Sequence, residues 1–166
     1  MKYLIYLGLI VLLVPFQAVL FNRVAIFGVH PDLVLIAVCL IGLQAGELDA
    51  IVIGIALGFT QDLFSGSAHW TNIWLKPLLG LMASLASHNV VNLTLPFSLA
   101  LLMALSIFSG TVIFFLKPFQ SPGIDFFAAA QGILLPQAFL DAMLGVAVLK
   151  LIQFVAPTRH QLPTTL

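Results

Sequence analysis

Two carboxylates, Asp62 and Asp141, lie inside long apolar segments of the sequence. A carboxylate near the centre of a membrane helix costs roughly 2.5–3.5 kcal/mol on insertion scales, so each needs a partner or a function. Asp141 is either a proton or ligand site or a buried carboxyl bonded to a neighbouring helix, with Ser106 and Ser109 as candidate partners. Asp62 is either an anchor for a partner or ligand, or a structural bridge between two helices that pairs with Lys76.

These carboxylates do not predict catalysis. Intramembrane aspartyl proteolysis needs two facing carboxylates, and we expect Asp62 and Asp141 at different depths. The sequence has no Gly-x-Ser-x-Gly elbow, His-Glu-x-x-His pair or phosphate-binding loop. The histidines lack metal-ligand spacing, and Cys39, the one cysteine, is expected to be a small core residue. We therefore expect a protein that is not an enzyme and has no cofactor and no metal.

The composition indicates an integral membrane protein. The chain has 166 residues, of which 61% are hydrophobic and 7% are charged, whereas a soluble domain has about 25% charged residues. Six basic and six acidic residues balance, so no nucleic-acid partner is expected. We expect one transmembrane helical domain over residues 1–155 and a short polar tail over 156–166.

The hydropathy pattern predicts an all-α, polytopic membrane protein with about six transmembrane helices. A span needs about 20 apolar residues, and the expected helices cover residues 3–21, 31–45, 50–64, 74–88, 96–116 and 126–155. The first apolar run, of about 19 residues, is longer than a signal-peptide core, so we expect it to stay uncleaved. The second and third helices are short, and two spans are preferred over a re-entrant hairpin.

Prolines and acidic residues place the ends and irregularities of these helices. Pro15 and Pro136 should kink the first and last helices, and Pro77 is expected in the first turn of its helix. Asp32 is expected in the first turn of the second helix, and Asp49 at the N-cap of the third.

The polar ends of the spans leave the topology open. Basic residues divide three against three between the two sides, so the positive-inside rule does not choose an orientation. Arg23 and Asp32 flank the first loop and are expected to pair, if at all, at the surface, where such a pair contributes little.

Small residues recur every four positions from Gly42 through Gly46, Ala50, Gly54 and Gly58. Such spacing lets helix backbones approach closely in lipid, where hydrophobicity does not drive helices together. The pattern predicts that Gly54 and Gly58 are buried against another helix. It also offers grooves for a helix of a partner protein.

The segment from His30 to Ser67 resembles the rod shape-determining MreD family. In that family a Pro-Asp or Pro-Asn pair opens the second span, and a glycine-rich third span ends in a G-x-x-x-D-x-x-S-G-like pattern. The matching residues here are Pro31, Asp32, Gly54, Gly58, Asp62, Ser65, Gly66 and Ser67. A Gly-x-x-x-Pro in the last span, Gly132 and Pro136, is also similar.

The resemblance implies a non-enzymatic protein of the bacterial inner membrane. Such proteins bind the bitopic protein MreC and help to couple MreB filaments to peptidoglycan synthesis. RodA and a penicillin-binding transpeptidase are the indirect partners. The family is also similar in fold to the substrate-binding membrane subunits of energy-coupling-factor vitamin transporters. A small-molecule-binding transporter subunit is therefore the alternative function.

Overall fold

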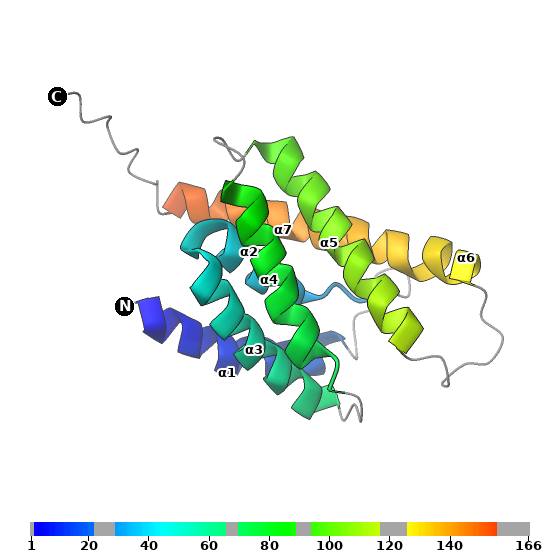
Figure 1. Ribbon diagram of the computed structural model, residues 1–166, viewed down its shortest axis with the longest axis horizontal. Helices are drawn as coiled ribbons and strands as arrows, with labels where there is room; N and C mark the ends of the chain where they lie inside the picture. Colours follow the sequence, from blue (N-terminus) through cyan, green and yellow to red (C-terminus); the bar gives the residue numbers. More distant parts are fainter. Residues whose placement is uncertain (1, 22–28, 66–69, 89–93, 117–125, 156–166) are drawn as a thin grey trace.

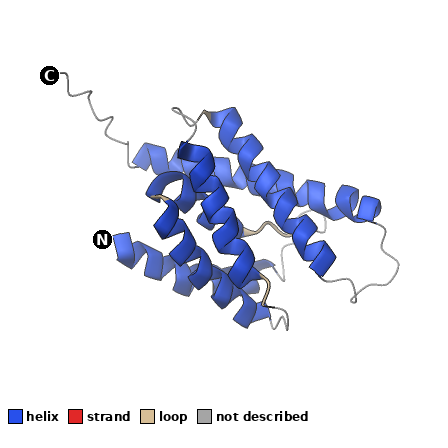
Figure 2. Ribbon diagram, viewed as in Figure 1, coloured by secondary structure: helices blue, strands red, loops and turns tan. Residues whose placement is uncertain are grey.

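The computed structural model describes residues 2–21, 29–65, 70–88, 94–116 and 126–155. Every regular element in these ranges is a helix, which confirms the all-α class (Figure 2). The elements are α1 (Lys2–Phe21), α2 (Leu33–Ala45), α3 (Glu47–Ser65), α4 (Asn72–His88), α5 (Leu95–Leu116), α6 (Phe126–Ala129), the π-helical turn η1 (Ala130–Leu134) and α7 (Leu135–Val155). The expected tail, 156–166, and Gly66 lie outside the described residues.

Three helices in the described part of the chain are long and apolar enough to cross a membrane. They are α3, α5 and the run from Phe126 to Phe154. Helix α2 has 13 residues and is therefore about 20 Å long, shorter than the roughly 30 Å of a bilayer's hydrocarbon core. The helix expected over residues 31–45 is therefore two residues shorter than expected, and its crossing of the membrane stays a prediction.

Large apolar side chains point away from the bundle. Examples on α3 are Leu48, Val52 and Leu63, and the last helix exposes Phe139 and Phe154 in the same way. Several carboxylates, serines and a lysine are buried instead. A surface of this kind suits lipid better than water and indicates a membrane protein.

Helix α2 is the centre of the fold. It contacts α1, α3, α4, α5 and α7, and nine of its 13 residues are buried (Figure 1). Leu35 and Cys39 pack into an apolar cluster with α4, α5 and α7, while Val34 and Val38 pack into a second cluster with α1 and α3. The interpretation of Cys39 as a core residue is confirmed.

One residue separates α2 from α3. Gly46 has a φ of 100°, a left-handed conformation that glycine adopts without steric cost. The chain therefore reverses at once, and α3 begins at Glu47 rather than at residue 50. Asp49 consequently lies in the first turn of α3 and not at its N-cap, where a carboxylate still favours the positive helix end.

Pro77 and Pro136 differ from expectation in detail. Helix α4 begins at Asn72, so Pro77 lies inside it rather than in its first turn. Pro136 follows the π-helical turn η1. Because proline has no N–H to donate, the helix around it cannot keep its regular bonding, and a wider turn is one way to accommodate this. The irregularity expected at Pro136 therefore takes the form of a π turn.

The small-residue pattern joins α3 to α4. A Cβ atom on Gly54 would lie 2.6 Å from the Cα of Pro77, and one on Gly58 would lie 2.3 Å from the carbonyl oxygen of Asn72. The prediction that both glycines are buried against another helix is confirmed. That helix belongs to the same chain, however, so the groove expected there for a partner protein is already filled.

Candidate functional site

A buried ion pair joins Asp32 to Lys76. Asp32 is the N-cap of α2: one of its carboxylate oxygens accepts the Leu35 N–H at 3.0 Å, and the other pairs with the Lys76 ammonium. Lys76 is fully buried and Asp32 is 8% exposed. The expected pair between Lys76 and Asp62 is therefore wrong.

The position of α2 explains this difference. The helix begins at Leu33 rather than at Pro31, and its first residues lie within the bundle. Pro31 and Asp32 are consequently buried, and the surface position expected for Asp32 beside Arg23 is wrong as well. Arg23 itself lies outside the described residues. Lys76 extends its stem inward from α4 to reach the carboxylate.

Asp141 completes the same cluster from α7. One carboxylate oxygen accepts the backbone N–H of Asp32 at 2.7 Å, and the other accepts the Ser106 hydroxyl at 2.6 Å. Asp141 is fully buried. Its interpretation as a carboxyl bonded to a neighbouring helix is confirmed, with Ser106 as the side-chain partner. Ser109 is buried nearby on α5, and no hydrogen bond joins it to Asp141.

Side chains also satisfy the free N–H groups at the start of α2. The side-chain carbonyl of Gln17 in α1 accepts the N–H of Val34 at 3.2 Å. A helix leaves its first N–H groups without intrahelical partners, and here Asp141, Gln17 and the Asp32 cap take three of them. The positive end of the α2 dipole therefore faces the Asp141 carboxylate.

The cluster lies at the middle depth of the bundle. Leu33 lies 12 residues before Ala45, the end of α2, and Lys76 lies 12 residues before His88, the end of α4. Asp141 lies 14 residues before the end of α7. At about 1.5 Å per residue, these separations place all three roughly 18–21 Å from the same end of the bundle. Gly46 joins the end of α2 to the start of α3, and His88 approaches Glu47 to 4.0 Å, so the end of α4 lies beside them. A helix N-terminus at this depth is tolerated only because protein surrounds it.

A cavity of about 290 Å³ opens beside the cluster. Its polar lining comes from Asp32, Ser106, Ser109 and Gln137. Its apolar lining is Leu35, Gly110, Ile113, Phe114, Ile133 and Leu134, so α5 and η1 form much of its wall. An apolar pocket with a few convergent polar groups is the usual form of a small-ligand site.

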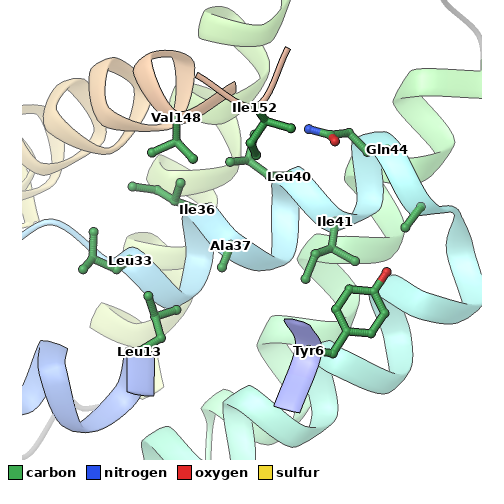
Figure 3. Close-up of a pocket in the computed structure, with 11 residues that line it drawn as sticks. Tyr6, Leu13, Leu33, Ile36, Ala37, Leu40, Ile41, Gln44, Val148 and Ile152 are labelled. Atoms are coloured by element: carbon green, nitrogen blue, oxygen red, sulfur yellow. The ribbon is translucent and has the colours of Figure 1, made fainter. Parts of the chain in front are cut away.

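A second, apolar groove of about 440 Å³ lies over α2 (Figure 3). Leu13 and Tyr6 of α1 line one side, and Val148 and Ile152 of α7 line the other. Among the described residues α1 and α7 do not contact each other. Gln44 provides an amide at one end of the floor, and the remaining lining is Leu33, Ile36, Ala37, Leu40, Ile41 and Ala45.

Asp62 serves a different purpose from the central cluster. Its carboxylate accepts the Asn72 amide at 2.8 Å and the backbone N–H of Ile73 at 2.9 Å, so it caps the start of α4 from α3. The interpretation as a bridge between these helices is confirmed, but through Asn72 and the backbone. Ser65 donates its hydroxyl to the Asp62 carbonyl at 3.2 Å.

Sequence reasoning missed two polar residues of the site. Gln17 and Gln137 were not singled out, although each interrupts a strongly apolar helix. An isolated amide in such a run needs a partner in the membrane interior, and that signal was present in the sequence.

A comparison of this chain with protein-family models, curated proteins and solved structures finds no significant match. Within the described ranges, no three histidine, cysteine or carboxylate side chains gather so that they could hold a metal ion.

Proposed function

We propose that this chain is a non-enzymatic, multi-pass subunit of the bacterial inner membrane that holds a single-span partner protein. The groove between α1 and α7 is the observation that carries this proposal. It is open and almost wholly apolar, and α7, which lines one side, belongs to a run long enough to cross a membrane. In lipid, helices associate by close packing, and small residues such as Ala37 and Ala45 on the floor favour close approach.

The resemblance to MreD identifies the proposed partner as an MreC-like bitopic protein. Through it the chain would contribute to the wall-elongation complex with MreB, RodA and a penicillin-binding transpeptidase. The internal packing of Gly54 and Gly58 against α4 moves the proposed contact away from α3. Gln44 at the groove's end can add an interhelical hydrogen bond. In model peptides such a bond contributes about 1–2 kcal/mol to helix association.

Six spans with both termini in the cytoplasm complete the proposal. The starts of α1 and α3 and the ends of α2, α4 and α7 lie toward one end of the bundle (Figure 1). Tyr6 donates its hydroxyl to Asp49 at 3.4 Å, which ties the start of α1 to that of α3. An alternating arrangement of this kind supports an even number of crossings.

Co-purification tests the scaffold proposal. A tagged chain should retain an MreC-like protein, and Ala37→Trp, which fills the groove floor, should reduce that recovery at least fivefold. Val148→Trp on the α7 side is a second variant. The matched control is Ala104→Trp on the exposed face of α5, which should bind normally. Size-exclusion behaviour checks folding. Normal recovery with both groove variants, or no recovery with the wild type, would refute the proposal.

The cavity beside Asp32 favours a second candidate function. Polar groups beneath apolar walls suit a small-molecule-binding subunit of a transporter, and 290 Å³ is close to the lower limit of typical ligand pockets. Thermal stabilisation by a vitamin-sized ligand, together with failure to recover an MreC-like protein, would replace the scaffold proposal with this one.

A further inference from the structure

We infer that the outer face of α3 and α4 packs against a locally thinned bilayer, so that the protein favours lipids with short hydrocarbon chains. The lengths of the lipid-facing helices and the position of two exposed tryptophans point to this independently. The inference rests on the membrane location of the chain and not on the scaffold proposal, because no residue of α3 or α4 lines the groove between α1 and α7.

The apolar part of this face is short. On α3 it lies between Asp49 in the first turn and Ser65 at the end, which are 16 residues and about 24 Å apart. On α4, Asn72 at the start and the exposed His88 at the end are also 16 residues and about 24 Å apart. The hydrocarbon core of a typical bilayer is about 30 Å thick, so both helices are about 6 Å too short. The exposed apolar side chains between these ends include Val52, Ile55, Phe59, Leu78, Met82 and Leu85.

Helix α5, which does not contact α3, has the length of an ordinary span (Figure 1). Its 22 residues extend about 32 Å, and Leu95 and Phe115 are exposed near its two ends. The run from Phe126 to Phe154 has 29 residues and extends about 42 Å. A long helix can fit a thinner bilayer by tilting, whereas tilting makes the span of a short helix shorter still. The bilayer must therefore adjust at the face of α3 and α4.

Two tryptophans mark the end of this face. Trp74, in the first turn of α4, is 78% exposed, and Trp70, 43% exposed, stacks on Phe59 of α3 with ring centroids 5.6 Å apart. Trp70 has a φ of 44°, which a bulky residue keeps only where its surroundings hold it. Indole rings concentrate at the headgroup level of a membrane. Trp74 precedes His88 by 14 residues, about 21 Å, so this level lies well within 30 Å of the other end.

The other ways of covering a short span do not fit this face. Snorkelling needs lysine or arginine side chains, and the only one in α3 and α4 is Lys76, which is buried. Association with another helix favours small residues, but Gly54 and Gly58 of α3 already face α4. The outer face instead presents branched and aromatic side chains, which suit lipid chains.

Thermal unfolding of the purified, full chain in nanodiscs of different thickness tests the inference. The lipids are dimyristoleoyl-, dipalmitoleoyl-, dioleoyl- and dieicosenoyl-phosphatidylcholine, in order of rising chain length, and circular dichroism follows the helices. We expect the Tm to be highest in one of the two thinner bilayers and to fall as the chains lengthen. A Tm that is highest in one of the two thicker bilayers, or that is equal in all four, would overturn the inference.

Quenching by brominated lipids then locates the effect on the protein. Trp70→Phe leaves Trp74 as the only tryptophan. Leu48 is 80% exposed in the first turn of α3, so Leu48→Trp in a tryptophan-free background reports the other end of the face. In dioleoyl bilayers we expect bromines near the headgroups to quench both probes at least twofold more than bromines near the chain ends. If the bilayer keeps its full thickness, at least one probe responds more to the deep bromines, and the inference fails.

Helix α5 provides the matched control. Leu95→Trp and Phe115→Trp, each in the tryptophan-free background, lie 20 residues and about 30 Å apart, so both should be shallow without any thinning. A deep position for either would contradict the comparison of the two sides of the bundle. Absence of quenching of Trp74 by any brominated lipid would show that a second copy or another protein covers the face, and would also overturn the inference.

Discussion

Replacing Lys76 with methionine tests whether the buried ion pair holds α2 against α4. Methionine keeps a long, unbranched side chain but removes the ammonium. Asp32, 8% exposed, would keep its bond from Leu35 and lose its counter-charge. Removing one member of a buried pair typically costs about 3–5 kcal/mol, because the other charge stays buried. We expect Lys76→Met to lower the free energy of unfolding by that amount.

The double variant Lys76→Met with Asp32→Asn provides the decisive comparison. Asparagine caps a helix as well as aspartate does and leaves no uncompensated charge. The double variant should therefore be more stable than Lys76→Met alone by about 1–3 kcal/mol. Asp32→Asn alone completes the cycle and leaves the ammonium unpaired.

Unfolding in mixed micelles of rising sodium dodecyl sulfate content gives the four free energies, with Trp70 and Trp74 as the fluorescent probes. Non-additivity is the sign of a direct interaction between the two residues. If the two single changes add in the double variant within about 0.5 kcal/mol, the residues act independently, and the ion pair is not what joins α2 to α4.

Gly58→Ala should destabilise the protein by about 1–3 kcal/mol through overpacking against Asn72, whereas Gly132→Ala, whose added Cβ meets nothing within 4 Å, should not; the unfolding assay compares them. Asp62→Ala should cost about 0.5–2 kcal/mol through loss of the α4 cap, and Asp62→Asn should cost less. Reporter fusions at Leu48 should show the cytoplasm, and fusions at Ser121 the periplasm.

Controls make each of these decisive. Equal melting temperatures for the Gly58 and Gly132 variants would contradict the close approach of α3 and α4. A loss for Asp62→Asn as large as that for Asp62→Ala would show that the carboxylate's charge matters more than its role as an acceptor. A fusion at Leu166 should agree with the one at Leu48, and disagreement between them would rule out an even number of crossings.

The sequence predicted contacts that depend on local pattern. Gly54 and Gly58 repeat at the helical period, so any partner helix had to approach their face closely. Asp62 belonged to the same face and was correctly expected to bridge to the next helix. Asp141 needed a hydroxyl from a neighbouring helix, and Ser106 was the right candidate.

The sequence did not predict contacts that depend on where α2 begins. Hydropathy allowed the helix to start at Pro31 and cross fully, which would have left Asp32 at the surface. The packing of α1, α4 and α7 around α2 instead buries Asp32 and brings Lys76 to it. Asp32 and Asp141 are 109 residues apart, and no local periodicity reports a bond across such a separation.

The central position of α2 has a consequence for synthesis of the chain. Helices leave the ribosome in order, and Asp32 is made 44 residues before Lys76 and 109 residues before Asp141. Until then α2 is too short to cross alone and carries a carboxylate without a counter-charge, a combination that membrane insertion disfavours. Stable placement of α2 must therefore wait for α4, and its N-terminal end is fully bonded only after α7 arrives. Deletion of α7 should consequently destabilise the placement of α2, although the two helices are far apart in the sequence.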